Sequence, residues 1–358
     1  MNTWHCVHVQ YYAPDKDALI LDAVRPLFEQ LRPHVERLHF ARHWRRGPHL
    51  RLFVKADPDT WTRVVRPRID TVVGGYLAEH PSTHVPDVAR ELAEHRLLAL
   101  HEREEGPLTP WLPDNTIHEQ PYDPRAHVVR SPETAELMAG FAADSTPLVF
   151  DMLESVREGR DRKDLIAVEL MLTTSSTVRP PITRSFVSYR SHAEGYLHAC
   201  NDPEAVRTAF EHHYQTHRQS YVDRVRAVLA NSPPTTPHAR PWATLCHFYS
   251  HRVEPLIEAG AVFPTLPGDP PAKPLRTPMH AKMFGNRAFR ERIFNDPGFR
   301  RYRFTLNCTY VNISRLGLSP YERMRTCHAA ANAVEEVHGV SALDIVDRFV
   351  TAHPNTPA

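Results

Sequence analysis

Hydrophobic and polar positions alternate at the start of the chain, where residues 3–12 are rich in valine and aromatic side chains and predict a strand. Residues 16–38 place apolar side chains at helical spacing after Asp15, a suitable N-cap, and Pro26 and Pro33 are expected to kink or split this helix. Two further alternating segments flank a Gly-Pro turn and predict a β-hairpin. The chain therefore opens as strand, helix, hairpin.

Helical periodicity dominates the chain after the hairpin. Residues 57–101 predict helices, and a polar, proline-rich stretch at 106–132 interrupts them. This stretch is too long for a simple connector, so it is expected to be functional or to pack as an extended arm. Helices resume at 132 and continue in segments to about 259, before a second proline-rich loop at 263–277.

Two helix starts carry capping signals. Asp144-Ser145-Thr146-Pro147 offers a cap followed by proline in the first turn, and Ser319-Pro320-x-Glu322 fits a capping box. A final helix is expected from Ala342.

The predicted fold class is α+β. An antiparallel sheet in a strand-helix-hairpin unit packs against a largely helical remainder. We expect one domain over 1–358, with an α/β subregion at about 1–105, the proline-rich arm at 106–132 and a helical subregion at 133–358.

Composition excludes several classes of function. The chain has 43 basic and 42 acidic residues, a net charge of +1 that offers no field for nucleic acid. Five scattered cysteines without a C-x-x-C pair argue against disulfide frameworks and thiolate zinc sites. No apolar run is long enough to span a membrane and no signal peptide is visible, so a cytoplasmic protein is expected.

Arginine makes up nearly all of the basic residues, since only five are lysine. A GC-rich coding genome explains such a bias, and so does a site that grips carbonyl or carboxylate groups through planar guanidinium forks. Composition does not separate these two explanations.

Motifs for common cofactors are missing. The i,i+4 pairs His39/His43 and His213/His217 lack a third ligand, so no metal site is expected. Glycine-rich phosphate loops and a G-x-S-x-G elbow are also missing, and we expect no cofactor.

Polar residues in apolar surroundings are the remaining candidates. In the hairpin, alternation puts His49 and Arg51 on one face and Leu50 and Leu52 on the other, with Arg42 on the partner strand. The alternative is a solvated hairpin face without function.

A second polar segment, Ser188-Tyr189-Arg190-Ser191-His192-Ala193-Glu194, is expected to open a helix. A capping box between Ser191 and Glu194 is the purely structural alternative.

The third set lies near the end of the chain, where helical spacing puts Tyr310 three residues from Asn307 and Arg315 three from Asn312. Satisfied polar groups in the core are the alternative here.

A set of residues follows in a fixed order along most of the chain: Trp4, Tyr11-Tyr12, Arg42, Pro48-His49-Leu50-Arg51-Leu52, Tyr122-x-Pro124, Phe141-Ala-Ala-Asp144-Ser145, Ser314-Arg315-Leu316-x-Leu318 and Glu322. In this order the set resembles the C-terminal domain of lantibiotic dehydratases, which eliminates glutamate to give dehydroalanine. Stand-alone relatives act in thiopeptide biosynthesis as elimination proteins or as pyridine synthases.

Departures from the eliminating members point to the second group. Those members carry Tyr-x-Pro-Glu-x-x-Arg-Tyr-Gly-Gly, where this chain has Arg125 for the glutamate, Val128 for the arginine and no paired glycines. Tyr310 replaces a family histidine, and Phe53 replaces a second arginine after Pro-His-Leu-Arg. The resemblance therefore implies a pyridine synthase.

The implied reaction is a formal (4+2) aza-cycloaddition of two dehydroalanines in a thiazole-containing precursor peptide, with subsequent loss of water and of the leader peptide as an amide. We expect Tyr310 to act as hydrogen-bond donor, with His192 as proton shuttle and Glu194 as its partner. Substrate-binding roles are expected for the remaining candidates: Arg42, His49, Arg51, Ser188, Tyr189, Asn307, Asn312 and Arg315.

The partner implied is a ribosomally made precursor whose leader binds the N-terminal unit or the proline-rich arm. Two alternatives stay open, a glutamate-elimination lyase of a split dehydratase and a non-catalytic leader-binding protein.

Overall fold

The structure is a computed structural model that describes residues 1–231, 236–262 and 277–355. Most of the second proline-rich loop, 263–276, lies outside the described residues. The chain forms two compact units, the first from Met1–Arg157 with Ser314–Gly317 and the second from Glu158–Ile313 with Leu318–Ala358. None of the described helices combines the length and apolarity that crossing a membrane requires.

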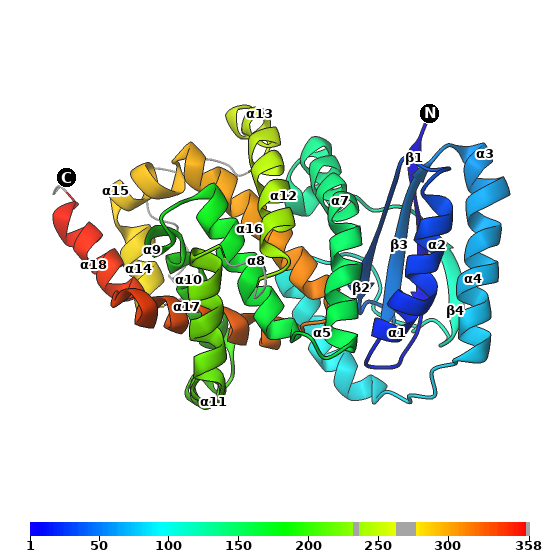
Figure 1. Cartoon of the computed structure of the whole chain (residues 1–358), viewed down its shortest axis with the longest axis horizontal. Helices are drawn as coiled ribbons and strands as arrows, with labels where there is room; N and C mark the ends of the chain where they lie inside the picture. The colour runs from blue at the N-terminus through cyan, green and yellow to red at the C-terminus, as the bar shows by residue number, and fades with distance from the viewer. Residues whose placement is uncertain (232–235, 263–276, 356–358) are drawn as a thin grey trace. The chain divides into compact units, whose positions relative to one another are not determined.

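A four-stranded antiparallel sheet is the centre of the first unit (Figure 1). Its strands are β1 (Thr3–Gln10), β2 (Arg37–His43), β3 (His49–Ala56) and β4 (Thr116–Gln120), in the order β2-β3-β1-β4. The predicted strand-helix-hairpin opening and the α+β class are confirmed.

The helices of the first unit follow the chain as α1 (Asp17–Leu19), the π-helical η1 (Ile20–Val24), α2 (Arg25–Leu31), α3 (Pro58–Thr60), the π-helical η2 (Trp61–Val65), α4 (Arg66–Glu79), α5 (Val88–Glu102), α6 (Ala126–Val129) and α7 (Pro132–Arg157). The predicted helix over 16–38 changes to π geometry before Pro26 and ends before Pro33. Residues 133–157, grouped with the helical subregion from the sequence, belong to this unit.

Strand register gives the sheet two different faces. Leu50 and Leu52 lie opposite Val9 and Val7, and all four side chains are fully buried. Helices cover this apolar face, where the ring of Phe150 on α7 stacks at 5.7 Å on a phenylalanine of β2. The hairpin therefore contributes one face to the core, as the alternation predicted.

The predicted helix start at 144–147 is wrong, because α7 continues through it. The hydroxyl groups of Ser145 and Thr146 donate to the carbonyl of Ala142, at 3.1 and 2.8 Å, and do not cap a new helix. Arg315 also donates to this carbonyl, at 3.0 Å. Tertiary contacts thus stabilise a helix interior in which Pro147 supplies no backbone donor.

Strand β4 was not predicted, since it lies inside the proline-rich stretch. It pairs with β1 from Cys6↔Gln120 to Gln10↔Thr116. The five residues of β4, Thr-Ile-His-Glu-Gln, contain a single β-branched aliphatic side chain and no turn signal. Only their pairing with β1 identifies them as a strand.

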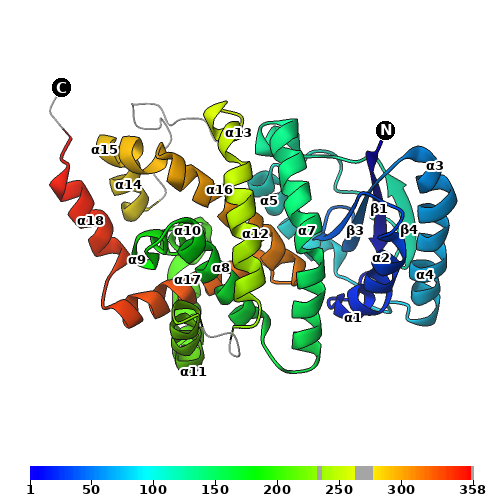
Figure 2. The same ribbon diagram turned by 45° about the horizontal axis from the view of Figure 1, so that its top comes forward.

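The second unit is helical (Figure 2). Its elements are α8 (Lys163–Val178), α9 (Ile182–Ser185), α10 (Val187–Ala199), α11 (Pro203–Leu229), α12 (Ala239–Arg252), α13 (Glu254–Glu258), α14 (Pro278–Gly285), α15 (Arg287–Phe289), the π-helical η3 (Arg290–Phe294), α16 (Pro297–Arg315, its last two residues in the first unit), α17 (Pro320–His338) and α18 (Ala342–Ala352). Helix α17 packs against α8, α10 and α11. Ser319 and Glu322 form the predicted capping box, and α18 starts at Ala342 as expected.

Arg315 provides a test of buried polar packing in the first unit. Its guanidinium lies 4.5 Å from the Phe40 ring centre and donates to Ser145 Oγ, and the residue is 1% exposed. We expect Arg315→Ala to lower the free energy of unfolding by roughly 3 kcal/mol, because buried acceptors lose their donor and a cavity forms. Arg63→Ala removes a guanidinium that is 76% exposed and should cost less than about 0.5 kcal/mol. Equal urea-unfolding midpoints for the two variants would contradict this.

Candidate functional site

The second unit brings together a phenol and an imidazole that the sequence singled out. Tyr310 projects from α16 and its hydroxyl lies 2.7 Å from Nδ1 of His192 on α10. The two rings meet edge to face, with centroids 5.1 Å apart. The thiol of Cys327 on α17 donates to the same hydroxyl at 3.6 Å. We call Tyr310 and His192 the phenol–imidazole pair.

Both members of this pair are uncharged near neutral pH. Burial raises the pKa of the Tyr310 phenol well above its ordinary value, and Cys327 adds to the shift. Although part of the His192 residue is exposed, desolvation of its ring lowers the pKa to about 4, helped by the positive charges of Arg323 and Arg303. The pKa of the Cys327 thiol is raised to about 11, mainly by burial.

These protonation states determine which atoms donate and which atoms accept in the hydrogen bonds of the pair. Because the thiol donates to the Tyr310 oxygen, the phenol proton is free to go to Nδ1 of His192 or to a bound substrate. When it goes to Nδ1, the imidazole proton sits on Nε2, at the other side of the ring. The pair therefore presents hydrogen-bond donors without carrying a charge.

A second imidazole lies in the same neighbourhood. Nε2 of His280, on α14, is 2.9 Å from the hydroxyl of Ser191, and its Nδ1 is 2.7 Å from the hydroxyl of Thr277. Gly195 lies against the same ring, at a distance where a Cβ would be in ordinary contact with it. His280 also contributes to the lowered pKa of His192. We call Ser191, His280 and Thr277 the hydroxyl–imidazole relay.

Sequence reasoning missed His280, Thr277 and Cys327. One histidine among 24 carries no local signal, and the cysteine has no nucleophile motif around it. Their proximity to Ser191 and Tyr310 depends on how distant helices pack, which the sequence pattern does not encode.

The expectation that Glu194 partners His192 is wrong. Both carboxylate oxygens of Glu194 accept from Arg207 of α11, each at 2.8 Å. The alternative capping box with Ser191 is wrong as well, because α10 already begins at Val187. Glu194 therefore ties two helices together and lies in an ion pair.

The other candidate residues of the second unit differ in how accessible they are to a bound peptide. Tyr189 is fully buried and donates to the Met171 carbonyl at 2.6 Å, while Asn312 is 1% exposed and donates to the Cys308 carbonyl at 2.9 Å. Neither offers surface to a peptide in this structure, and Asn312 fits the alternative of satisfied core polarity.

Ser188 and Asn307 remain partly exposed. Ser188 hydrogen-bonds the Tyr302 hydroxyl. Asn307 lies one turn before Tyr310 on α16, as its spacing predicted, and its role in orienting the peptide stays a prediction.

In the first unit, His49 and Arg51 are buried at 0% and 7% exposure, so the alternative of a solvated hairpin face is wrong. Arg51 Nε donates to His49 Nε2 at 3.3 Å, and His49 Nδ1 lies 2.8 Å from the Gly47 carbonyl. Burial lowers the pKa of His49 well below its ordinary value, so this imidazole is neutral. The face that carries these residues is polar but closed.

Glu104 supplies the negative charge on this polar face. Its carboxylate is 2% exposed and lies 3.3–3.5 Å from nitrogen atoms of Arg51, Arg45 and Arg125. Burial opposes its ionisation, but His43 together with Arg125 and Arg51 outweighs burial and lowers the Glu104 pKa to about 2. Arg125, which stands where eliminating relatives carry glutamate, is thus a structural counter-ion.

Arg42 and Arg315 meet in the same unit. Arg42 Nε donates to the Arg315 carbonyl at 2.9 Å, and its guanidinium pairs with Asp17. Gly317 has a φ of +95°, and a Cβ there would lie 3.1 Å from the Arg42 guanidinium carbon. Both arginines therefore hold internal partners in this structure.

The histidines of the two i,i+4 pairs contact aromatic side chains and not a shared metal site. His39 stacks on Phe53 at 4.4 Å, and His213 Nε2 lies 2.9 Å from the Tyr221 hydroxyl. Within the described ranges, no group of three or more His, Cys, Asp or Glu side chains is placed to hold a metal ion.

Comparisons with known proteins place this geometry in context. The family model described as lantibiotic biosynthesis dehydratase C-term matches residues 4–334. The structure is similar to a pyridine synthase, TbtD, from thiomuracin biosynthesis, with 35% identity, a TM-score of 0.77 and coverage of 94% of this chain and 99% of that one. It shares its fold with TsrL, at 19% identity, a TM-score of 0.69 and full coverage of both chains. No curated protein sequence matches this chain.

Glu104 yields a prediction with a defined pH dependence. We expect Glu104→Gln to lower the free energy of unfolding at neutral pH by roughly 3 kcal/mol, because the buried guanidinium of Arg51 and the partly exposed ones of Arg45 and Arg125 lose their carboxylate. The folded-state pKa is depressed from 4.5 to about 2, so the stabilisation is fully present above the unfolded pKa and is lost as pH falls toward 2. The difference between wild type and variant should shrink over that window.

Urea unfolding of both proteins from neutral to acidic pH measures this difference. Glu94→Gln is the matched control, since its side chain is 65% exposed and should contribute less than about 0.5 kcal/mol. A difference that does not change with pH would contradict the assignment of Glu104 as the ionised partner.

Proposed function

The chain belongs to the lantibiotic biosynthesis dehydratase C-terminal family, and from this premise we propose that it is a pyridine-forming cyclase of thiopeptide biosynthesis. The observation that carries the proposal is the similarity to TbtD along nearly the whole of both chains, at 35% identity. Its substrate is a ribosomally made precursor peptide, with a leader and a dehydrated, thiazole-containing core.

The reaction joins two dehydroalanines. One reacts as its imidic-acid tautomer, a 2-azadiene, and the other as the alkene. Two carbon–carbon bonds form at the ends of the azadiene while three π bonds become one, so a six-membered ring closes without change of mass. Water then leaves with one ring proton, and the leader leaves as an amide with a second. The product is an aromatic pyridine within a macrocycle, and no oxidant is consumed.

Tyr310 and His192 suit the first stage of this chemistry. The amide must lose a proton from nitrogen and gain one on oxygen, so a group that gives a proton to that oxygen lowers the barrier to the imidic form. A neutral phenol–imidazole pair can hydrogen-bond the oxygen without creating a buried charge. Holding two tethered alkenes together supplies the larger share of the acceleration, up to about 7–11 kcal/mol.

The hydroxyl–imidazole relay suits the second stage, in which water and the leader amide leave. Loss of water and of the leader amide each require a proton on the leaving group. His280 can take the proton that the ring carbon loses, and the Ser191 hydroxyl bonded to it can pass a proton to the leaving group, so that the relay returns to its starting state. Thr277 orients the ring from its other nitrogen.

A glutamate-eliminating lyase is the weaker candidate. Elimination needs a base for the α-proton and groups that receive the departing glutamate. In this chain Arg51 and Arg125 face Glu104, and a phenol stands at the family's histidine position. These contacts favour cyclisation over elimination.

Mass spectrometry on two peptides separates the three candidates. The cyclase converts a linear, dehydroalanine-bearing thiazolyl precursor to a macrocycle and releases leader amide. An eliminating lyase would instead release glutamate from a glutamylated serine peptide. A non-catalytic protein would bind the leader and leave both peptides unchanged.

Tyr310→Phe removes the phenolic donor and keeps the ring. We expect turnover to fall roughly tenfold or more, the scale for loss of a positioned proton donor, while leader affinity is unchanged. Turnover is measured as macrocycle formed per enzyme, and affinity by fluorescence anisotropy. Wild-type turnover in the variant would remove Tyr310 from the reacting set.

Ser191→Ala and His280→Gln should act later in the reaction. We expect cyclised peptide that retains the leader to accumulate, with leader-amide release slowed roughly tenfold or more. Thr216→Ala, on α11, is the control, because its hydroxyl only bonds the His212 carbonyl of its own helix. Leader release at the wild-type rate in both relay variants would exclude this role.

A further inference from the structure

One face of α10 is open beside the phenol–imidazole pair. Its members follow one another at helical spacing and are half-buried or exposed: Ser188, Ser191, His192, Gly195 and Tyr196. The opposite face carries the buried residues of the helix. Tyr196 lies one helical turn after His192, so an aromatic ring follows the reacting groups on this open face.

Two half-buried tyrosines and a buried phenylalanine form a cluster of rings here. Tyr196 meets Tyr321 of α17 edge to face, with ring centroids 6.5 Å apart. The Tyr196 ring stacks on Phe210 of α11 at 6.3 Å, and the Tyr321 ring meets Phe210 edge to face at 5.1 Å. Since α10, α11 and α17 pack against one another, the fully buried Phe210 holds both tyrosine rings in place. We call Tyr196 and Tyr321 the tyrosine platform.

The chemistry of the tyrosine platform restricts what can bind to it. The guanidinium of Arg325 lies 5.8 Å from the centre of the Tyr321 ring and would repel a second cation, while the negative ring faces disfavour an anion. Neither phenol hydroxyl has a hydrogen-bond partner among the described residues, so each can donate to a ligand. A flat, uncharged ring with a nitrogen acceptor meets all of these conditions. Thiazole is such a ring.

We infer that the tyrosine platform is a subsite that binds a thiazole of the core peptide and thereby places the neighbouring dehydroalanine at the phenol–imidazole pair. The thiazole stacks on a phenol ring, and its nitrogen accepts a hydrogen bond from a hydroxyl of the platform. Because thiazole and dehydroalanine are joined by a short tether, one bound ring limits where the alkene can lie. The inference rests on the proposed function, because it takes the ligand to be the precursor.

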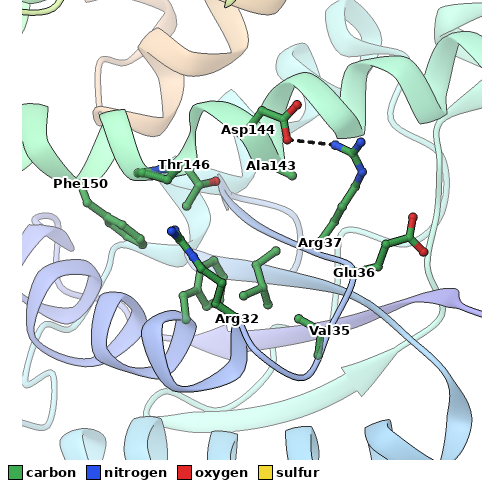
Figure 3. A pocket seen from close by; sticks show the side chains of 11 residues that line it. Arg32, Val35, Glu36, Arg37, Ala143, Asp144, Thr146 and Phe150 are labelled. Atoms are coloured by element: carbon green, nitrogen blue, oxygen red, sulfur yellow. Dashed lines mark hydrogen bonds and ion pairs between the residues drawn. The ribbon is translucent and has the colours of Figure 1, made fainter. Parts of the chain in front are cut away.

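The cavity of the first unit offers no comparable surface (Figure 3). It holds about 320 Å³ between α2, the start of β2 and α7. Its two phenylalanine rings, Phe28 and Phe150, are buried, and Figure 3 shows Arg37 paired with Asp144 at its rim. A flat ring therefore finds no exposed aromatic face among the residues that line this cavity, which makes it a suitable place for a control substitution.

Binding is measured by isothermal titration calorimetry with two leader-free core peptides, one with thiazoles and one with the uncyclised cysteines. Serine at the dehydroalanine positions keeps both peptides from reacting. We expect the wild type to bind the thiazole peptide roughly fivefold or more tightly, and Tyr196→Leu and Tyr321→Leu each to lose most of this preference. Tyr196→Phe keeps the ring and should retain most of it.

Two substitutions serve as controls. Phe248→Leu removes a ring that is 50% exposed on α12, and Val35→Trp fills the cavity of the first unit. Both should keep the wild-type preference for thiazole. Circular dichroism verifies that each variant is folded.

Nuclear magnetic resonance of the bound thiazole peptide needs no variant. A stacked aromatic ring shields the protons of its neighbour, so we expect the thiazole proton to move upfield on binding to the wild type. An unshifted proton, equal binding of the two peptides, or an unchanged preference in both leucine variants would overturn the inference. Failure of the proposed function shows differently, as a wild type that prefers the thiazole peptide and never cyclises the full precursor.

Discussion

The first unit depends on the pairing of charged side chains that are buried on the polar face of the sheet. Arg51 enters the protein interior from β3, and Arg45 and Arg125 join it from two other segments. Glu104 offsets these charges from the turn after α5, at 2% exposure. Residues 102–125 are thereby held near the strands, which lets β4 pair with β1. Burial of the apolar face provides the core, and Glu104 makes burial of the opposite face possible.

The same ion pairs separate this chain from relatives that handle glutamate. Arginines that could receive a substrate carboxylate already face an internal one. The phenol–imidazole pair left for chemistry in the second unit is neutral, and a second imidazole, hydroxyl groups and a thiol lie around it. Such groups suit a reaction that rearranges bonds and expels neutral water and amide, without a charged intermediate to stabilise.

Local patterns predicted local features well. Alternation in residues 3–12 and in the hairpin identified three strands and their faces, and Ser319 with Glu322 marked a helix start. Local cues gave wrong predictions where tertiary contacts override them: Ser145 and Thr146 bond within α7, and Ser191 bonds His280 in the middle of α10.

The candidate site residues show the same difference between local patterns and tertiary contacts. Tyr310 and His192 were predicted individually, and their hydrogen bond depends on how α16 packs near α10. Glu104 had no sequence signal, because its burial and its arginines come from four separate segments. The sequence pattern finds residues on one element, and it does not show which distant elements bring them together.

A single-turnover pH profile of macrocycle formation shows whether neutral donors assist the cyclisation. Because the His192 pKa is about 4 and that of Tyr310 is well above its ordinary value, the pair keeps one protonation state across neutral pH. We expect macrocycle formation at a rate that is nearly constant between about pH 6 and pH 9. Absence of the macrocycle, or a bell-shaped profile centred in that range, would contradict it.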